Sequence, residues 1–136
     1  MIQFTVNQII AHFIGDFWLQ NQWMANNKTK RWIPAIIHSF FYTLPFIPLC
    51  TQNPLTLFII MSTHAIEDRY YLIKHFIAWK NRIGNCKTIG ILKYNDIDEN
   101  TGAVEGTPDW VAYPLLWIQD NVLHLLINGL AIYWIG

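Results

Sequence analysis

The chain has 136 residues, which suits one domain, and no linker rich in Gly, Ser or Pro divides the sequence. Apolar residues make up 53% of it and charged residues only 13%, where soluble domains carry roughly 25% charged residues. The net charge is zero, and no run of Lys and Arg with interleaved aromatic residues occurs. These properties exclude nucleic-acid binding as a leading hypothesis and are typical of a membrane protein.

Four apolar segments follow one another along the chain, over residues 4–23, 32–49, 55–73 and 110–135. Each is about long enough to cross a bilayer, which takes roughly 20 helical residues. The first has neither a basic leader nor a cleavage site, so we expect it to stay as the first helix. The sequence predicts a single all-α domain, 1–136, an integral membrane four-helix bundle with helices over about 4–23, 32–49, 55–79 and 110–135. A polar loop, 81–109, connects helices three and four.

All nine basic residues fall in two regions, 28–31 and 69–93. Basic residues concentrate on the cytoplasmic side of membrane proteins. We therefore expect both regions and the polar loop to be cytoplasmic, with both termini on the other side of a bacterial inner membrane. Cys50 and Cys86 then lie on opposite sides, and a disulfide between them is not expected.

Histidine and aspartate recur at a spacing of four within the predicted helices. The pairs are His12 and Asp16, His64 and Asp68, and Asp120 and His124, and His38 stands with Tyr42 on helix two. This spacing places both side chains on one helical face. At about 1.5 Å of rise per residue, the His and Asp residues fall in one band in the cytoplasmic half of the membrane. Ionisable residues inside membrane helices need partners or a task, so we expect these residues to meet.

Four imidazoles and three carboxylates suit one or two ions of zinc, manganese, iron or nickel, because calcium and magnesium prefer more oxygen ligands. The predicted ligands are His12, Asp16, His38, His64, Asp68, Asp120 and His124, and Asp16, Asp68 and Asp120 are also the predicted catalytic carboxylates. Gln20, Tyr42, Asn128 and Lys28 are predicted to support the ligands or bind substrate. Glu67 is expected on a neighbouring face or in such a supporting position. A hydrogen-bonded clamp between helices is the competing interpretation.

The order of these residues resembles that of a family of small bacterial and phage membrane proteins known as domain of unknown function 3307. The matching stretches are AHFIGDFWLQNQWMANNK, IIHSFFYTL, THAIED and IQDNVLHLL. The resemblance covers all four predicted helices and carries no assigned activity. The family is also distantly similar to membrane-bound metal-dependent hydrolases of bacteria, and this second likeness is an analogy. The loop over 83–108 is longer than the simplest family members need.

The leading hypothesis is a metal-dependent membrane hydrolase that acts on a lipid or lipid-linked phosphate or ester. A membrane adaptor, whose cluster is a structural metal site or polar clamp, and a small proton-coupled carrier or channel subunit are the alternatives. The expected partners are membrane lipid and a lipid-phosphate substrate, with homo-oligomerisation left open. A soluble helical enzyme also stays open, because polar residues interrupt every apolar segment.

Overall fold

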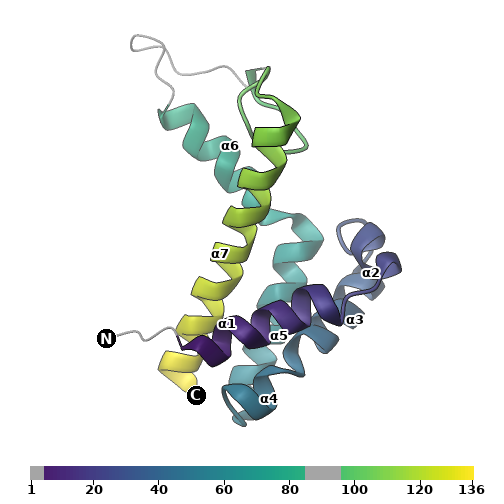
Figure 1. Ribbon diagram of the computed structural model, residues 1–136, viewed down its shortest axis with the longest axis vertical. Helices are drawn as coiled ribbons and strands as arrows, with labels where there is room; N and C mark the ends of the chain where they lie inside the picture. Colours follow the sequence, from purple (N-terminus) through teal and green to yellow (C-terminus); the bar gives the residue numbers. More distant parts are fainter. Residues whose placement is uncertain (1–4, 85–95) are drawn as a thin grey trace. The chain divides into compact units, whose positions relative to one another are not determined.

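The computed structural model describes residues 5–84 and 96–136, which are helical apart from short connections and contain no strand. They form two compact units (Figure 1). The first unit is Met1–Tyr70 with Leu123–Gly136, and the second unit is Tyr71–Val122. The predicted all-α class is confirmed, whereas the single domain over 1–136 stays a prediction.

The first predicted helix, 4–23, is divided into three pieces in the structure. They are α1 (Val6–Phe13), the π-helical turn η1 (Ile14–Trp18) and α2 (Gln22–Asn27). The Leu19 N–H bonds the Ile14 carbonyl, five residues back, at 3.0 Å, which is the widened turn of a π-helix. Asn21 then caps α2 by accepting a hydrogen bond from the Met24 N–H. Side-chain capping thus starts a new helix inside the apolar segment.

Proline and a left-handed residue divide the next two segments. The second contains α3 (Trp32–Thr43) and α4 (Phe46–Leu49), with Pro45 between them. The third contains α5 (Pro54–Tyr70) and α6 (Leu72–Gly84), separated by Tyr71 with a φ of 50°. A non-glycine residue in this region ends regular helix geometry, so the predicted single helix over 55–79 is wrong.

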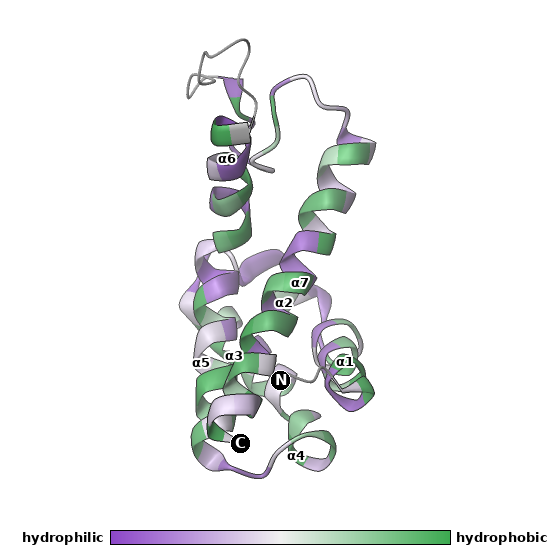
Figure 2. Ribbon diagram, turned by 90° about the vertical axis from the view of Figure 1, so that its left-hand side faces the viewer, coloured by the Kyte–Doolittle hydropathy of each residue, from purple (hydrophilic) through white to green (hydrophobic). Residues whose placement is uncertain are grey.

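The last predicted helix is confirmed as α7 (Asp109–Ile135), which contains Pro114 and contributes residues to both units. In the first unit, α3 and α5 pack side by side, and α1 contacts α4 (Figures 1 and 2). A small core joins α1, α3, α4, α5 and α7 through Ala11, Tyr42, Phe46, Ile60 and Ala131. This core fixes the helices from which the polar cluster is built.

The first unit buries polar side chains and exposes large apolar ones. Its buried polar residues are Gln8, His12, Asp16, His38, Ser39, Thr43, Thr56, His64, Glu67, Asp68, His124 and Asn128. Ile33 and Phe58, in contrast, are 69% and 61% exposed. A domain surrounded by water seldom buries this many polar side chains.

Two stretches are long and apolar enough to cross a membrane, Trp32–Leu49 and Asp109–Ile135. A buried core helix of a soluble protein meets the same criteria of length and composition. Among the described residues, the first and third predicted spans do not meet them. The integral four-helix arrangement therefore stays a prediction.

The second unit consists of α6, the turn after the undescribed residues 85–95, and the first half of α7. Ile97 and Val104 form an antiparallel bridge around this turn, in which the Asp98 carboxylate accepts the backbone N–H groups of Asn100 and Thr101. Because α6 extends to Gly84, the polar connection begins later than the predicted 81–109.

Candidate metal centre

Asp16 enters the buried cluster from the π-helical turn η1. Gly15, next to it, lies so close to α3 that a Cβ atom there would be 2.6 Å from the Tyr42 carbonyl oxygen. The missing side chain lets η1 approach α3 closely, and Asp16 meets His38 there. The His38 Nε2 atom lies 3.1 Å from Asp16 Oδ1, and both side chains are buried.

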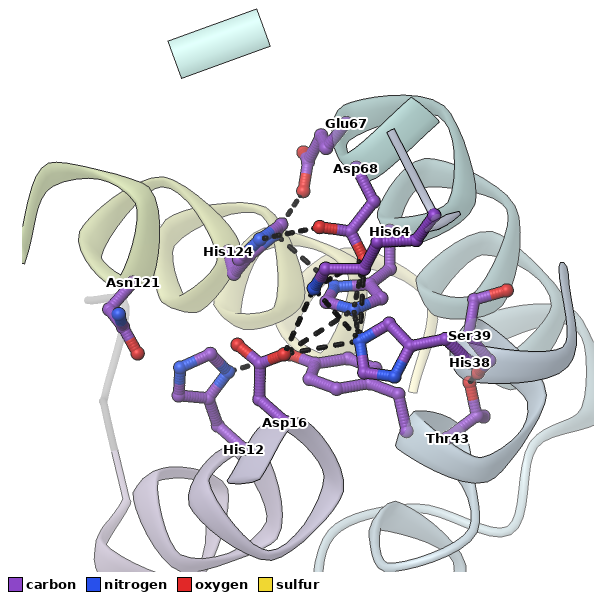
Figure 3. A network of polar contacts seen from close by, with 12 residues as sticks. His12, Asp16, His38, Ser39, Thr43, His64, Glu67, Asp68, Asn121 and His124 are labelled. Atoms are coloured by element: carbon purple, nitrogen blue, oxygen red, sulfur yellow. Dashed lines mark hydrogen bonds and ion pairs between the residues drawn. The ribbon is translucent and has the colours of Figure 1, made fainter. Parts of the chain in front are cut away.

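His64 and Asp68 lie one turn apart on α5 and face the same place as His38. The His64 Nε2 atom is 3.0 Å from His38 Nε2 and 3.3 Å from Asp68 Oδ2. His38 Nε2 is also 3.3 Å from Asp68 Oδ2. Two imidazole nitrogens and two carboxylate oxygens therefore point toward one another from η1, α3 and α5 (Figure 3).

A lysine ammonium group lies within this group of atoms. Lys28, at the end of α2, places Nζ 3.0 Å from Asp68 Oδ2, 3.6 Å from Asp16 Oδ1 and 3.3 Å from His38 Nε2. Its side chain is 15% exposed. Lys28 was predicted to bind substrate, and the structure places its charge between the two carboxylates.

His124 joins the cluster from α7. Its Nδ1 atom lies 3.3 Å from His64 Nδ1 and contacts Glu67 Oε2 in a short polar contact. The side chains of Glu67 and His124 are 5% and 1% exposed. The position of Glu67 three residues after His64 indicated a shared face on α5, which is the signal that could have identified it.

Two groups of three residues have the geometry to hold a metal ion. One is Asp16, His38 and His64, and the other is His64, Asp68 and His124. Within each group, one potential ligand atom per residue lies within 4.8 Å of the others, and all the residues are buried. The groups share His64, so this residue is part of either possible metal site.

The model of a protein family, described as protein of unknown function DUF3307, matches residues 4–91. The chain belongs to this family. No curated protein and no solved structure matches it. The DUF3307 match includes Asp16, His38, His64 and Asp68, and it ends before α7, which supplies His124. The description assigns no activity, so the chemistry rests on the residues of the cluster.

A second layer of hydrogen bonds lies beside the cluster of His and Asp side chains. His12 Nδ1 lies 2.8 Å from the Tyr42 hydroxyl oxygen, which also accepts a hydrogen bond from the Asn128 amide at 2.5 Å. The Tyr42 ring stacks on His64 with a centroid distance of 3.6 Å. His12, predicted as a ligand, thus contacts the group that holds His64 in place, and neither ligand group includes it.

Two other predicted residues are placed differently. Asp120 lies one turn before His124 on α7, in the part assigned to the second unit, and neither ligand group among the described residues contains it. The Gln20 side-chain oxygen is buried in the connection after η1 and has no hydrogen-bond partner among the described residues. The predicted roles of Asp120 and Gln20 stay predictions.

Proposed function

We propose that the cluster binds one or two divalent metal ions and that the protein is a metal-dependent hydrolase of lipid or lipid-linked phosphates or esters. The observation that carries the proposal is the meeting of two buried ligand groups at the shared residue His64. Bundles build metal sites in this way, from inward-facing side chains on neighbouring helices. The mixture of imidazole and carboxylate favours zinc, manganese, iron or nickel.

The contacts within the cluster indicate a place for positive charge. A neutral imidazole carries one N–H group. If neither His38 Nε2 nor His64 Nε2 carries it, two lone pairs face each other across 3.0 Å. Lys28 supplies one positive charge to the two buried carboxylates of Asp16 and Asp68, so a second negative charge still requires compensation. A divalent cation would accept lone pairs from all these atoms at once.

The residues divide into groups that hold an ion and groups that handle substrate. A bound divalent metal lowers the pKa of coordinated water and polarises a phosphoryl or carbonyl oxygen. Asp16 and Asp68 either bind the ion or take a proton from water, and Lys28 attracts an anionic phosphate. Glu67, Tyr42 and Asn128 orient His124 and His64 through their contacts with these rings or with one another.

A membrane setting accounts for the buried polar side chains and the exposed apolar side chains of the first unit. Ionisable residues inside a bilayer face the protein interior, while lipid tails accept exposed Leu, Ile and Phe. We propose an integral inner-membrane protein with both termini outside the cytoplasm, in which lipid substrates reach the buried cluster past Lys28, whose side chain is 15% exposed. The two candidate spans support this proposal.

Metal content of the purified protein tests the metal centre. Protein prepared in mild detergent without chelators is analysed by elemental mass spectrometry, and the same preparation is screened against lipid phosphates and esters. We expect about one or two ions per chain of zinc, manganese, iron or nickel. Asp16→Asn and His64→Ala should lose metal and hydrolysis while staying folded by circular dichroism.

Thr56→Val is the matched control, because Thr56 is also buried on α5 and its hydroxyl has no hydrogen-bond partner in the described structure. This variant should keep metal and activity. Wild-type protein that takes up none of the four metals, even when they are added, would contradict the metal centre. Metal without hydrolysis of any lipid substrate would contradict only the hydrolase.

A second candidate function has support from Lys28. Its ammonium group already lies between Asp16 and Asp68, so the cluster is also suited to a clamp that joins α2, η1, α3 and α5 in a membrane adaptor. A clamp needs no metal, and its variants would lose stability rather than activity.

A further inference from the structure

Helix α6 has two apolar faces, and only one of them is buried. Ile73 and Ile77 are 2% and 5% exposed and form the packed face. Phe76 and Trp79, in contrast, are 51% and 57% exposed, although they lie on the same helix. Burial therefore accounts for the first face and leaves the second without a role.

The exposed face is a continuous stripe along the whole helix, and we call it the α6 stripe. It consists of Leu72, Phe76, Trp79 and Ile83, which are 39%, 51%, 57% and 62% exposed. With about 100° of rotation per residue, these four positions fall within about 60° of one another around the axis. Such an arrangement is typical of an amphipathic helix with one well-defined apolar side.

Basic residues flank the α6 stripe. The helix, LIKHFIAWKNRIG, contains Lys74, Lys80 and Arg82 and no acidic residue. By the same rotation, about 100° per residue, Lys80 lies on one side of the stripe, and His75 and Arg82 lie on the other. Lys80 and His75 are exposed, and the Lys80 ammonium donates a hydrogen bond to the Gln119 side-chain oxygen at 2.5 Å. The methylene groups of long basic side chains cover neighbouring apolar surface. Figure 2 shows the resulting mixture of hydrophobic and hydrophilic turns in α6.

We propose that α6 is an interfacial helix, whose α6 stripe enters the boundary between lipid headgroups and acyl chains while Lys80, His75 and Arg82 contact lipid phosphates. Helices that lie in a membrane surface combine these same features, an aromatic and aliphatic face and a basic border. Trp79, near the middle of the stripe, is the residue type that favours this boundary most strongly. The proposal goes beyond the metal centre and is independent of it.

The start of α6 agrees with this placement. Tyr71, with a φ of 50°, ends the regular helix of α5 before Leu72. The helix has 13 residues, so at about 1.5 Å per residue it is too short to cross a bilayer, which takes roughly 20 residues. A helix lying in the surface needs no such length.

Spin labels on the full-length protein in lipid vesicles test the proposal. In a Cys50→Ser, Cys86→Ser background, single cysteines replace Phe76 and Ile83 in the stripe, and Asn100 in the exposed turn as the control. Power saturation measures collisions of each label with oxygen, which concentrates in lipid, and with a water-soluble nickel chelate. We expect the oxygen-to-nickel ratio at Phe76 and Ile83 to exceed the ratio at Asn100 several-fold.

A charge in the stripe provides a second test. Phe76→Asp should move a label at Ile83 into water, because an aspartate opposes insertion, whereas Asn100→Asp should leave that label unchanged. Both positions are exposed, so neither change disturbs packing. Stripe labels that meet the nickel chelate as often as the Asn100 label would overturn the proposal. Dipolar broadening between stripe labels, or a stripe closed to both reagents, would overturn it in favour of a second copy or another protein.

Discussion

At the scale of single residues, Lys28 contributes a positive charge to the cluster. Its ammonium group lies 3.0 Å from Asp68 Oδ2 and 3.6 Å from Asp16 Oδ1, near the place where a metal ion would bind. Two cations this close repel each other strongly in a buried site. Metal binding therefore requires Lys28 to turn away from the two carboxylates.

The variant Lys28→Met distinguishes the metal-centre hypothesis from the clamp hypothesis. If the cluster binds metal, the variant should stay folded and bind zinc or manganese about tenfold more tightly, since a competing cation is lost. If the cluster is a clamp, two carboxylates lose their partner and the free energy of unfolding should fall by about 3–5 kcal/mol.

Competition with a chelating dye and thermal unfolding in detergent measure both quantities. Lys30→Met is the control, because Lys30 is exposed on the same connection. A variant with unchanged metal affinity and unchanged stability would contradict both assignments of Lys28.

The four-residue spacing in the sequence predicted which His and Asp residues share one face of a helix. The four-residue spacing of His64 and Asp68 placed both in the cluster. It did not indicate that His12 contacts Tyr42 and lies outside both ligand groups. The inward position of Lys28 was not predictable, because it depends on the break after η1 that turns α2 toward α3 and α5.

At the scale of elements, hydrophobicity located the apolar segments and missed their interruptions. Pro45 is a visible signal for the end of α3, whereas the π-helical turn η1 and the left-handed Tyr71 have no comparable sequence signal. The π-helical turn depends on a tertiary contact. The turn η1 places Gly15 against the Tyr42 backbone, a contact that no periodicity in residues 4–23 indicates.

Gly15→Ala tests this contact between η1 and α3. The added Cβ would lie 2.6 Å from the Tyr42 carbonyl oxygen and 2.9 Å from its Cα atom, so the backbone of one element must move. Overpacking of this kind costs about 1–3 kcal/mol, and the movement shifts Asp16 away from His38. We expect a lower thermal midpoint in detergent and weaker metal binding.

Ile10→Ala, on the exposed side of α1 at 43% exposure, should leave both quantities close to those of the wild type. Wild-type stability in Gly15→Ala would show that η1 does not pack on α3 as closely as described.

At the scale of the whole molecule, the distribution of basic residues predicts which connections face the cytoplasm, and the chain contains two natural reporters of this topology. Cys50 follows the candidate span Trp32–Leu49, and Cys86 lies in the predicted cytoplasmic loop, outside the described residues. The two thiols are the only cysteines. They should therefore react with a membrane-impermeant maleimide from opposite sides.

The reaction at Cys50 should also depend on pH in a defined direction. Partial burial raises the pKa of the Cys50 thiol to about 11, and the thiolate is the reactive form. In right-side-out vesicles of Cys86→Ser, labelling should be slow at neutral pH and accelerate about tenfold for each pH unit toward 11. In Cys50→Ser, Cys86 should be labelled only in inside-out vesicles. Labelling of both thiols from one side would contradict the predicted topology, because an odd number of crossings has to separate the connection at Cys50 from the loop at Cys86.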